Sequence, residues 1–268
     1  MLTVQGFAYL FGKDVDNLFL KWNWNLRIKY EKIINSSVKY LSTIGLENNA
    51  FAPFENGQKR YEICEITNQP GIDARDYDKK YDVVFYSRVD RDKGIEDLIK
   101  SIGILKQRGE RFSVIIIGKV TPAYKENLLG IMKSMNISDQ FEFAGFLEDH
   151  MDVYKLAASA KLLALPTLDD CQPNSIREAM FMRLPVISTK VGGIPNLNSH
   201  MHCVHLINRG DVEALADGIH TILNDADYAE RLIENSYKEM VNYFAPSQIY
   251  KQMIDAYKDI YRISENSK

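Results

Sequence analysis

Two carboxylates, Asp170 and Glu178, stand eight residues apart in the stretch DDCQPNSIREAMFMRLPVISTKVGGIP. Proline suits the first turn of a helix, and Ser175-Ile-Arg-Glu178 has the pattern of a capping box, so we predict a helix that begins near Asn174. The free N–H groups at such a helix start favour a phosphate, and the flanking carboxylates can accept hydrogen bonds from sugar hydroxyls. The spacing therefore predicts a site for a sugar phosphate.

The same stretch contains further motifs. The acidic residue, seven intervening residues, Glu-Ala-Met, R-x-P-V-I and V-G-G-I-P together resemble the signature of the retaining glycosyltransferases of family 4, which have the GT-B fold. The resemblance implies that Glu178 binds the nucleotide ribose and that Asp170 contacts the transferred sugar. The chain departs from the usual pattern in having Asp at 170, where Glu is typical, and Cys171, where Gly is typical, and this bears on the identity of the donor sugar.

A second charged segment, S-R-V-D-R-D-K-G, follows the apolar run VVFY. A solvated turn is the simpler interpretation, but Lys93 at the start of the next helix would oppose the helix dipole by about 0.3–1 kcal/mol unless an anion is also present. The resemblance assigns Arg88 and Lys93 to the donor diphosphate, whose charge they would neutralise without a metal. It implies that further residues bind the donor: Gly118, Phe146, Cys171, Asn174, Ser175, Gly192 and Gly193.

A purely structural role is the alternative interpretation for several of these positions. Glu178 could serve only to cap a backbone N–H, and Asp170 could be a turn residue. Gly192-Gly193 could be no more than a permissive turn before a proline. The register of Asp170 with Glu178 and the downstream motifs favour the functional interpretation of both carboxylates.

The elements that must position these residues alternate from about Tyr81 onward. Apolar strands alternate with helical patterns, which predicts an α/β fold with a doubly wound, parallel, Rossmann-like sheet. Asp211 precedes VEALADGI as a helix cap. Ligands bind such sheets at the carboxyl ends of the strands, where the sequence places Arg88, Gly118, Gly145, Asp170 and Gly192. The strand and helix segments are YDVVFY, GIEDLIKSIGILKQ, FSVIII, YKENLLGIMKSM, FEF, DVYKLAASA, KLLALP, SIREAMFM, PVIS, CVHL and DVEALADGIHTIL.

The first residues follow another pattern, with a short strand-like LTV, a long helical stretch from Leu18 to about Leu41, and a polar linker. We expect residues 1–76 to be a partial, mainly helical remnant of an acceptor domain with its linker. Residues 77–268 are then expected to form the nucleotide-sugar-binding donor domain. The resemblance implies that its amphipathic closing helix, roughly Ile249 to Tyr261, crosses back onto the acceptor domain.

Composition narrows the possible classes of protein. The chain has 268 residues, 46% hydrophobic and 26% charged, with a net charge of −3 that offers no general attraction for nucleic acid. Three cysteines, Cys64, Cys171 and Cys203, lack metal-type spacing, and His200, His202 and His205 lack suitable partner ligands, so no cofactor or metal is predicted. No signal peptide is evident, and we expect a cytoplasmic protein. Peripheral attachment to the inner face of the membrane is an alternative location.

The predicted function is transfer of a hexosyl group from a nucleotide sugar to an acceptor hydroxyl with retention, in cell-surface polysaccharide or lipopolysaccharide synthesis. The expected partners are a nucleotide-sugar donor, a saccharide or lipid-linked saccharide acceptor, and a partner chain or a missing N-terminal domain. The first alternative is a non-catalytic or split nucleotide-sugar-binding half that needs a partner acceptor domain. A sugar-nucleotide epimerase is a weaker alternative, which the Glu-Ala-Met loop disfavours.

Overall fold

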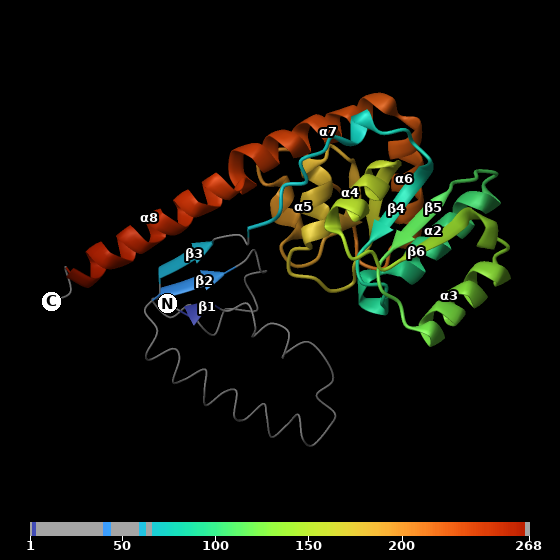
Figure 1. Cartoon of the computed structure of the whole chain (residues 1–268), viewed down its shortest axis with the longest axis horizontal. Coiled ribbons are helices and arrows are strands. Elements are labelled where there is room, and N and C mark those ends of the chain that lie inside the picture. Colours follow the sequence, from blue (N-terminus) through green and yellow to red (C-terminus); the bar gives the residue numbers. More distant parts are fainter. Residues whose placement is uncertain (1, 4–39, 44–58, 63–65, 266–268) are drawn as a thin grey trace, which may run out of the picture. The chain divides into compact units, whose positions relative to one another are not determined.

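The computed structural model describes residues 2–3, 40–43, 59–62 and 66–265 (Figure 1). The chain divides into two compact units. One unit comprises Met1–Glu65 with Pro246–Lys268, and the other is Ile66–Ala245, called the 66–245 unit below. The candidate site residues of the sequence all lie in the 66–245 unit.

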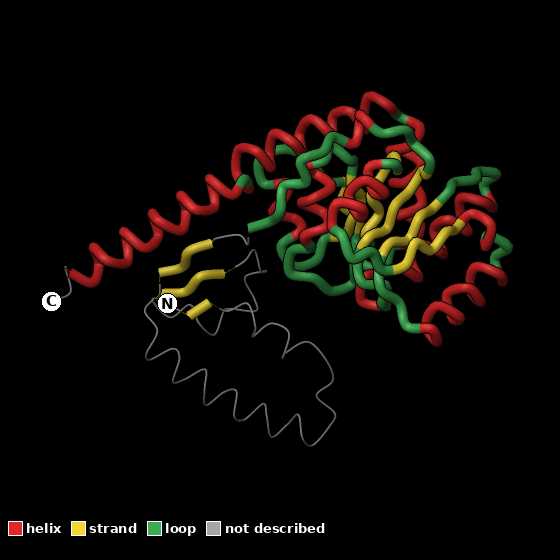
Figure 2. The backbone as a smooth tube through the Cα atoms, in the orientation of Figure 1, coloured by secondary structure: helices red, strands yellow, loops and turns green. Residues whose placement is uncertain are grey.

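The 66–245 unit is built on a six-stranded parallel sheet, whose strands lie between layers of helix in Figure 2. The strand order is β6-β5-β4-β7-β8-β9. Apolar side chains fill both faces of its central strands, because a parallel sheet is covered by helices on both sides. The strands are Tyr81–Tyr86 (β4), Val114–Ile117 (β5), Phe141–Gly145 (β6), Ala160–Leu165 (β7), Val186–Thr189 (β8) and His205–Ile207 (β9).

Helices alternate with these strands as the sequence predicts. The chain runs from β4 toward β6 on one side and from β7 toward β9 on the other, so right-handed crossovers place helices on opposite faces. Asp211 caps its helix by accepting a hydrogen bond from the Ala214 N–H at 3.0 Å, as predicted. The helices are Ile95–Gln107 (α2), Pro122–Ser134 (α3), His150–Ala158 (α4), Asn174–Phe181 (α5), Val212–Asn224 (α6) and Ala226–Glu239 (α7). Helix α7 was not among the helices predicted from the sequence.

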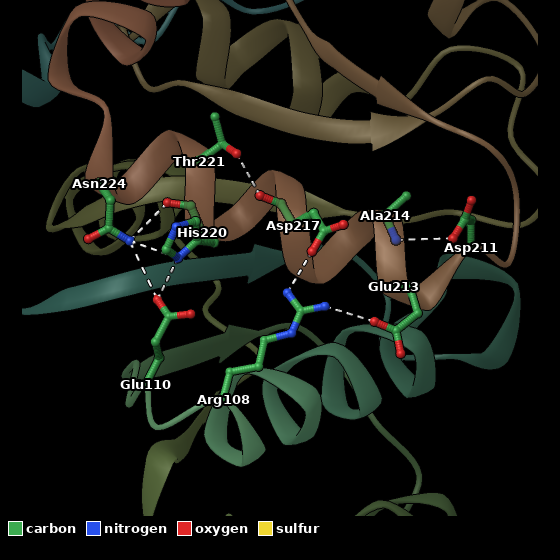
Figure 3. A network of polar contacts seen from close by, with 9 residues as sticks. All are labelled: Arg108, Glu110, Asp211, Glu213, Ala214, Asp217, His220, Thr221 and Asn224. Carbon is green, nitrogen blue, oxygen red and sulfur yellow. Dashed lines mark hydrogen bonds and ion pairs between the residues drawn. The ribbon is translucent and has the colours of Figure 1, made fainter.

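A polar network links the end of α2 to α6 (Figure 3). Arg108 forms ion pairs with Glu213 at 2.9 Å and with Asp217 at 2.5 Å. Glu110 contacts the ring of His220 at 2.7 Å. Arg108 and Glu110 are at the amino-terminal edge of the sheet, because α2 runs back from the carboxyl end of β4. Exposed pairs of this kind each contribute little stability.

The other unit contains a parallel sheet of three short strands, Leu2–Thr3 (β1), Tyr40–Thr43 (β2) and Lys59–Glu62 (β3), and the helix Pro246–Glu265 (α8). The predicted strand at LTV is confirmed by β1. The predicted helix from Leu18 lies outside the described residues up to residue 39, and its end near Leu41 is wrong. Tyr40 and Leu41 are strand residues there, because β2 pairs with strands on both sides.

The predicted closing helix is confirmed as an element by α8, and Cys64 lies outside the described residues. Among the helices that the structure describes, none combines the length and apolar character needed to cross a bilayer.

Candidate active site

The candidate residues gather at the carboxyl edge of the sheet, where β4 and β7 lie side by side. The chain leaves β4 toward β5 and leaves β7 toward β8, so the connections diverge at this point. Such a switch point opens a crevice between two loops, which is the usual ligand site of doubly wound sheets. The two loops here are residues 87–94, after β4, and residues 166–173, after β7.

The loop after β4 folds into a short 3-10 turn, Arg91–Lys93, before α2 begins at Ile95. The Asp90 side chain caps this turn by accepting from the Lys93 N–H at 3.1 Å. Gly94 follows with a φ of 74°, and a Cβ there would lie 1.8 Å from the Pro166 carbonyl oxygen. Lys93 therefore ends a separate 3-10 turn two residues before α2 begins, and the expectation that it opens this helix is wrong.

Hydrogen bonds join the two loops across the switch point. The carbonyl oxygen of Asp92 accepts from the Leu168 N–H at 2.7 Å and from the Thr167 hydroxyl at 3.0 Å. The close approach of Gly94 to Pro166 allows these bonds to form, because any side chain at 94 would push the loops apart. The loop after β7 is thereby held beside Lys93.

Lys93 and Asp170 form an ion pair between the Nζ and Oδ2 atoms. Each side chain is 13% exposed, so the pair is largely removed from water. Two residues predicted to contact the diphosphate and the sugar thus lie together, although 77 residues separate them in the chain. The Asp170 carboxylate therefore neutralises the positive charge of Lys93.

Arg88, predicted as the second cation, is placed differently. Its side chain is 64% exposed and forms an ion pair with Asp90 at 3.1 Å. The guanidinium is therefore on the same loop as Lys93, but it projects into solvent. An exposed pair of this type is weak, so Arg88 can exchange its partner for a phosphate at little cost.

Gly192 brings a third loop against Asp170. It has a φ of 52°, and a Cβ there would lie 1.9 Å from the Asp170 carbonyl oxygen. The next residue, Gly193, donates its N–H to the Cys171 carbonyl at 2.5 Å. The pair is therefore more than a permissive turn, because Gly192 is needed for the loop after β8 to pack on the Asp170 backbone.

Helix α5 begins at Asn174, as predicted, but the predicted capping box is wrong. Pro173 is the cap residue, no side chain caps the helix start, and Ser175 lies inside the first turn. The Asn174 side-chain oxygen accepts from the Thr67 hydroxyl at 3.1 Å and from Arg177 at 2.6 Å. Asn174 thus tethers the segment before β4 to the start of α5.

Glu178 has a tertiary partner in place of the predicted local one. Its Oε1 atom accepts a hydrogen bond from the Tyr154 hydroxyl at 3.0 Å, and the residue is only 8% exposed. Burial raises the pKa of Glu178, and the Tyr154 hydroxyl acts in the opposite direction. Burial and the neighbouring carboxylate raise the pKa of Tyr154 to about 12, so the phenol remains a donor.

Tyr154 was not predicted as a site residue from the sequence, where it lies in the helical segment DVYKLAASA. The available signal was chemical, because a tyrosine buried in a core must find a partner for its hydroxyl. A second buried tyrosine behaves alike, since the Tyr86 hydroxyl donates to the Ser175 carbonyl at 2.5 Å. Both phenols therefore fix α5 from neighbouring elements.

The ends of β5 and β6 complete this edge of the sheet. Gly118 has a φ of 148°, and a Cβ there would lie 1.8 Å from the Ser87 carbonyl oxygen. Its N–H donates to the Gly145 carbonyl at 2.8 Å. Phe146, next in the chain, is 68% exposed, which leaves an aromatic surface uncovered at the edge.

Cys171 is a free, partly buried thiol beside Asp170. Burial, with the negative charges of Asp170 and Asp169, raises its pKa. The three clustered histidines have protein partners, since His200 contacts Glu239 at 2.7 Å and the rings of His202 and His205 both contact the Tyr228 hydroxyl. In the described part of the chain, no group of three or more His, Cys, Asp or Glu is arranged to hold a metal.

Comparison with known protein families gives one match. The family model described as Glycosyl transferases group 1 matches residues 73–239, which is more than half of the chain. The match includes both loops of the switch point and all of α5.

Two curated relatives illustrate the similarity. The 2-deoxystreptamine N-acetyl-D-glucosaminyltransferase of Niallia circulans is 28% identical over 178 residues, covering 66% of this chain and 45% of that protein. The capsular polysaccharide biosynthesis glycosyltransferase CapM of Staphylococcus aureus is 23% identical over 184 residues, covering 68% and 47%. The chain therefore spans about half the length of the curated relatives it matches.

Solved structures show the same fold. Sucrose-phosphate synthase from Thermosynechococcus elongatus superposes with a TM-score of 0.71 at 20% identity, covering 89% of this chain and 62% of that chain. HepE from Anabaena, in complex with UDP, superposes with a TM-score of 0.70 at 19% identity, covering 88% and 68%. The predicted Rossmann-like α/β fold class of GT-B glycosyltransferases is confirmed.

Proposed function

Because the chain belongs to the family of glycosyl transferases group 1, we propose that its 66–245 unit binds a nucleotide sugar for hexosyl transfer with retention. The observation that carries the proposal is the ion pair of Lys93 with Asp170 at the switch point, which is the usual ligand site of doubly wound sheets. A phosphate can replace Asp170 as the partner of Lys93, which frees the carboxylate for the sugar hydroxyls.

Each side chain has a role in this scheme. Arg88 and Lys93 neutralise the diphosphate, Asp170 orients the sugar, and Glu178 accepts hydrogen bonds from the ribose. Arg88 can fork onto phosphate oxygens and Lys93 acts as a point charge, so charge neutralisation needs no added metal. The start of α5 has no side-chain cap, so its backbone N–H groups would be additional donors to a bound phosphate.

The reaction balances without a side-chain nucleophile. The bond from the sugar carbon to the diphosphate oxygen breaks, and the departing oxygen takes the proton of the acceptor hydroxyl. The acceptor oxygen then forms the new glycosidic bond on the same face. The proposed acceptor is a saccharide or a lipid-linked saccharide.

The relatives support this class of reaction over the alternatives. Both curated relatives are named as transferases, and CapM is named for capsular polysaccharide biosynthesis. A transferase is thus favoured over a binding-only half or an epimerase. Cell-surface polysaccharide or lipopolysaccharide synthesis is the pathway class that we propose for this chain.

Calorimetric titration with UDP, GDP and ADP, in buffer containing a chelator, tests the proposal. We expect one of the three to bind, and Glu178→Ala to weaken that binding by about 1.5–3 kcal/mol, the range for a hydrogen bond to a charged group. Glu142→Ala is the matched control, because Glu142 also accepts from a tyrosine hydroxyl, at 2.7 Å, on the exposed surface of β6. Binding that disappears with the chelator, or a Glu178→Ala variant with unchanged affinity, would contradict the proposed site.

A further inference from the structure

The buried carboxylate of Glu178 depends on a side chain from another helix. Tyr154, on α4, is 4% exposed and donates its hydroxyl proton to Glu178 Oε1 at 3.0 Å. Helix α4 packs against β4 and β7, the two strands that flank the switch point, so the phenol approaches α5 from a rigid support. The hydroxyl can donate only one hydrogen bond, and the Glu178 carboxylate accepts it.

A carboxylate in this position must stay ionised to bind a sugar diol. An ionised carboxylate accepts at about four lone-pair sites, so one bond from a tyrosine leaves capacity for two ribose hydroxyls. A protonated carboxyl presents an O–H donor and loses part of that capacity. Burial favours the protonated form, and a fixed hydrogen-bond donor favours the ionised form.

We propose that Tyr154 is a positioning residue that keeps Glu178 ionised and correctly oriented for the ribose of the nucleotide. This inference rests on the proposed function. Tyr154 does not itself touch the nucleotide, and it acts only through the carboxylate.

Other titratable groups face Glu178 and must be separated from this effect. His150 and Tyr154 act on it from α4, Arg177 from its own helix, and Tyr86 from β4. Arg177 stays charged throughout, and burial raises the pKa of Tyr86 well above its usual range, so the hydroxyl stays protonated. His150 also acts on the Glu178 carboxylate, so its contribution needs a variant of its own.

The test is the affinity for UDP, GDP or ADP, whichever binds most tightly, measured from about pH 5 to about pH 8. Tyr154→Phe keeps the ring and removes only the hydroxyl. We expect affinity about tenfold weaker at neutral pH, and a loss that grows as the pH falls, because Glu178 is protonated at a higher pH without its donor. The series is repeated with His150→Gln, which should leave the difference between wild type and Tyr154→Phe in place.

Two further variants separate positioning from packing. In a Glu178→Gln background, Tyr154→Phe should change affinity less than about twofold, because the carboxylate through which it acts is gone. Tyr81→Phe is the matched control, since Tyr81 also donates to a glutamate, Glu142, at 2.7 Å, but from the amino-terminal end of β4. The nucleotide affinity of Tyr81→Phe should equal that of the wild type. An NMR titration of the glutamate carboxyl carbons should show a higher pKa for Glu178 in Tyr154→Phe without any ligand.

The results distinguish this inference from the proposed function. An equal loss of affinity at every pH that persists in the Glu178→Gln background would overturn the inference, because it indicates a packing effect. Unchanged affinity in Tyr154→Phe, beside a clear loss in Glu178→Gln, would overturn it also and leave the nucleotide site intact. Absence of binding by the wild type to all three nucleotides would refute the proposed function itself.

Discussion

Removal of the positive charge of Lys93 is expected to destabilise the protein before any ligand is added. Lys93→Met keeps the length of the side chain and leaves Asp170 without its partner in a site where both side chains are 13% exposed. Unit charges about 4 Å apart attract by about 4 kcal/mol at an effective dielectric constant of about 20. The regained hydration of Asp170 and the freedom of its side chain offset part of this attraction. We therefore expect a loss of about 2 kcal/mol in the free energy of unfolding.

Thermal denaturation provides the assay. A loss of about 2 kcal/mol corresponds to a fall in Tm of about 4–8 °C for a domain of this size. Asp170→Asn in the same chain should restore most of it, because the uncompensated carboxylate is removed. Lys161→Met is the matched control. Lys161 forms an ion pair with Asp82 at 2.8 Å, but its side chain is half exposed, so this variant should change the free energy of unfolding by less than about 1 kcal/mol.

Adding the nucleotide that binds the wild type extends the experiment. The wild type should gain thermal stability with ligand, and Lys93→Met should gain less, because the diphosphate has lost a cation. An unchanged or higher Tm of the ligand-free Lys93→Met variant would refute the reasoning, since it would show that the pair with Asp170 does not form in solution.

Three further predictions concern single positions. Gly192→Ala should lower both stability and nucleotide affinity, since its Cβ would lie 1.9 Å from the Asp170 carbonyl oxygen. Gly210 is the matched control, because it has a φ of 75° and open space around it, so Gly210→Ala should cost only the backbone strain of about 1 kcal/mol. Alkylation of Cys171, followed by mass spectrometry of its peptide, should slow when nucleotide is bound, and an unaltered rate at saturation would place the ligand elsewhere. Arg75 lowers the pKa of Asp73 from 3.8 to about 2, so this carboxylate stabilises the folded state above about pH 4 and loses that effect as the pH falls through about 2. In urea denaturation, the excess stability of the wild type over Asp73→Asn should shrink over that pH window. A constant difference in stability would contradict the prediction.

Local pattern predicted the framework of the site well. The apolar runs that become β4, β5, β7 and β8 are buried on both faces, which a parallel sheet requires, and their order along the chain places the loop residues at one edge. The start of α5 at Asn174 follows from Pro173, whose missing N–H suits the cap position. These inferences needed only periodicity and the chemistry of single residues.

Contacts between distant residues were not predictable in the same way. The Lys93 to Asp170 pair depends on Gly94 packing on the Pro166 carbonyl, which no local pattern reveals. The capping box was wrong because the helix begins one residue before Ser175, with Pro173 as the cap, and Glu178 accepts its hydrogen bond from Tyr154. A local hydrogen-bonding pattern therefore does not reveal which tertiary partner a buried side chain will find.

The most direct test of the central claim is where a nucleotide binds. Hydrogen exchange measured by mass spectrometry, with and without saturating UDP, GDP or ADP, should show slower exchange in residues 87–94 and 166–178. Residues 108–112, next to the Arg108 and His220 network of Figure 3 at the opposite edge of the sheet, should exchange at the same rate in both samples. Saturating ligand that slows exchange elsewhere, and leaves both loops of the switch point unchanged, would contradict the assignment of this crevice as the nucleotide-sugar site.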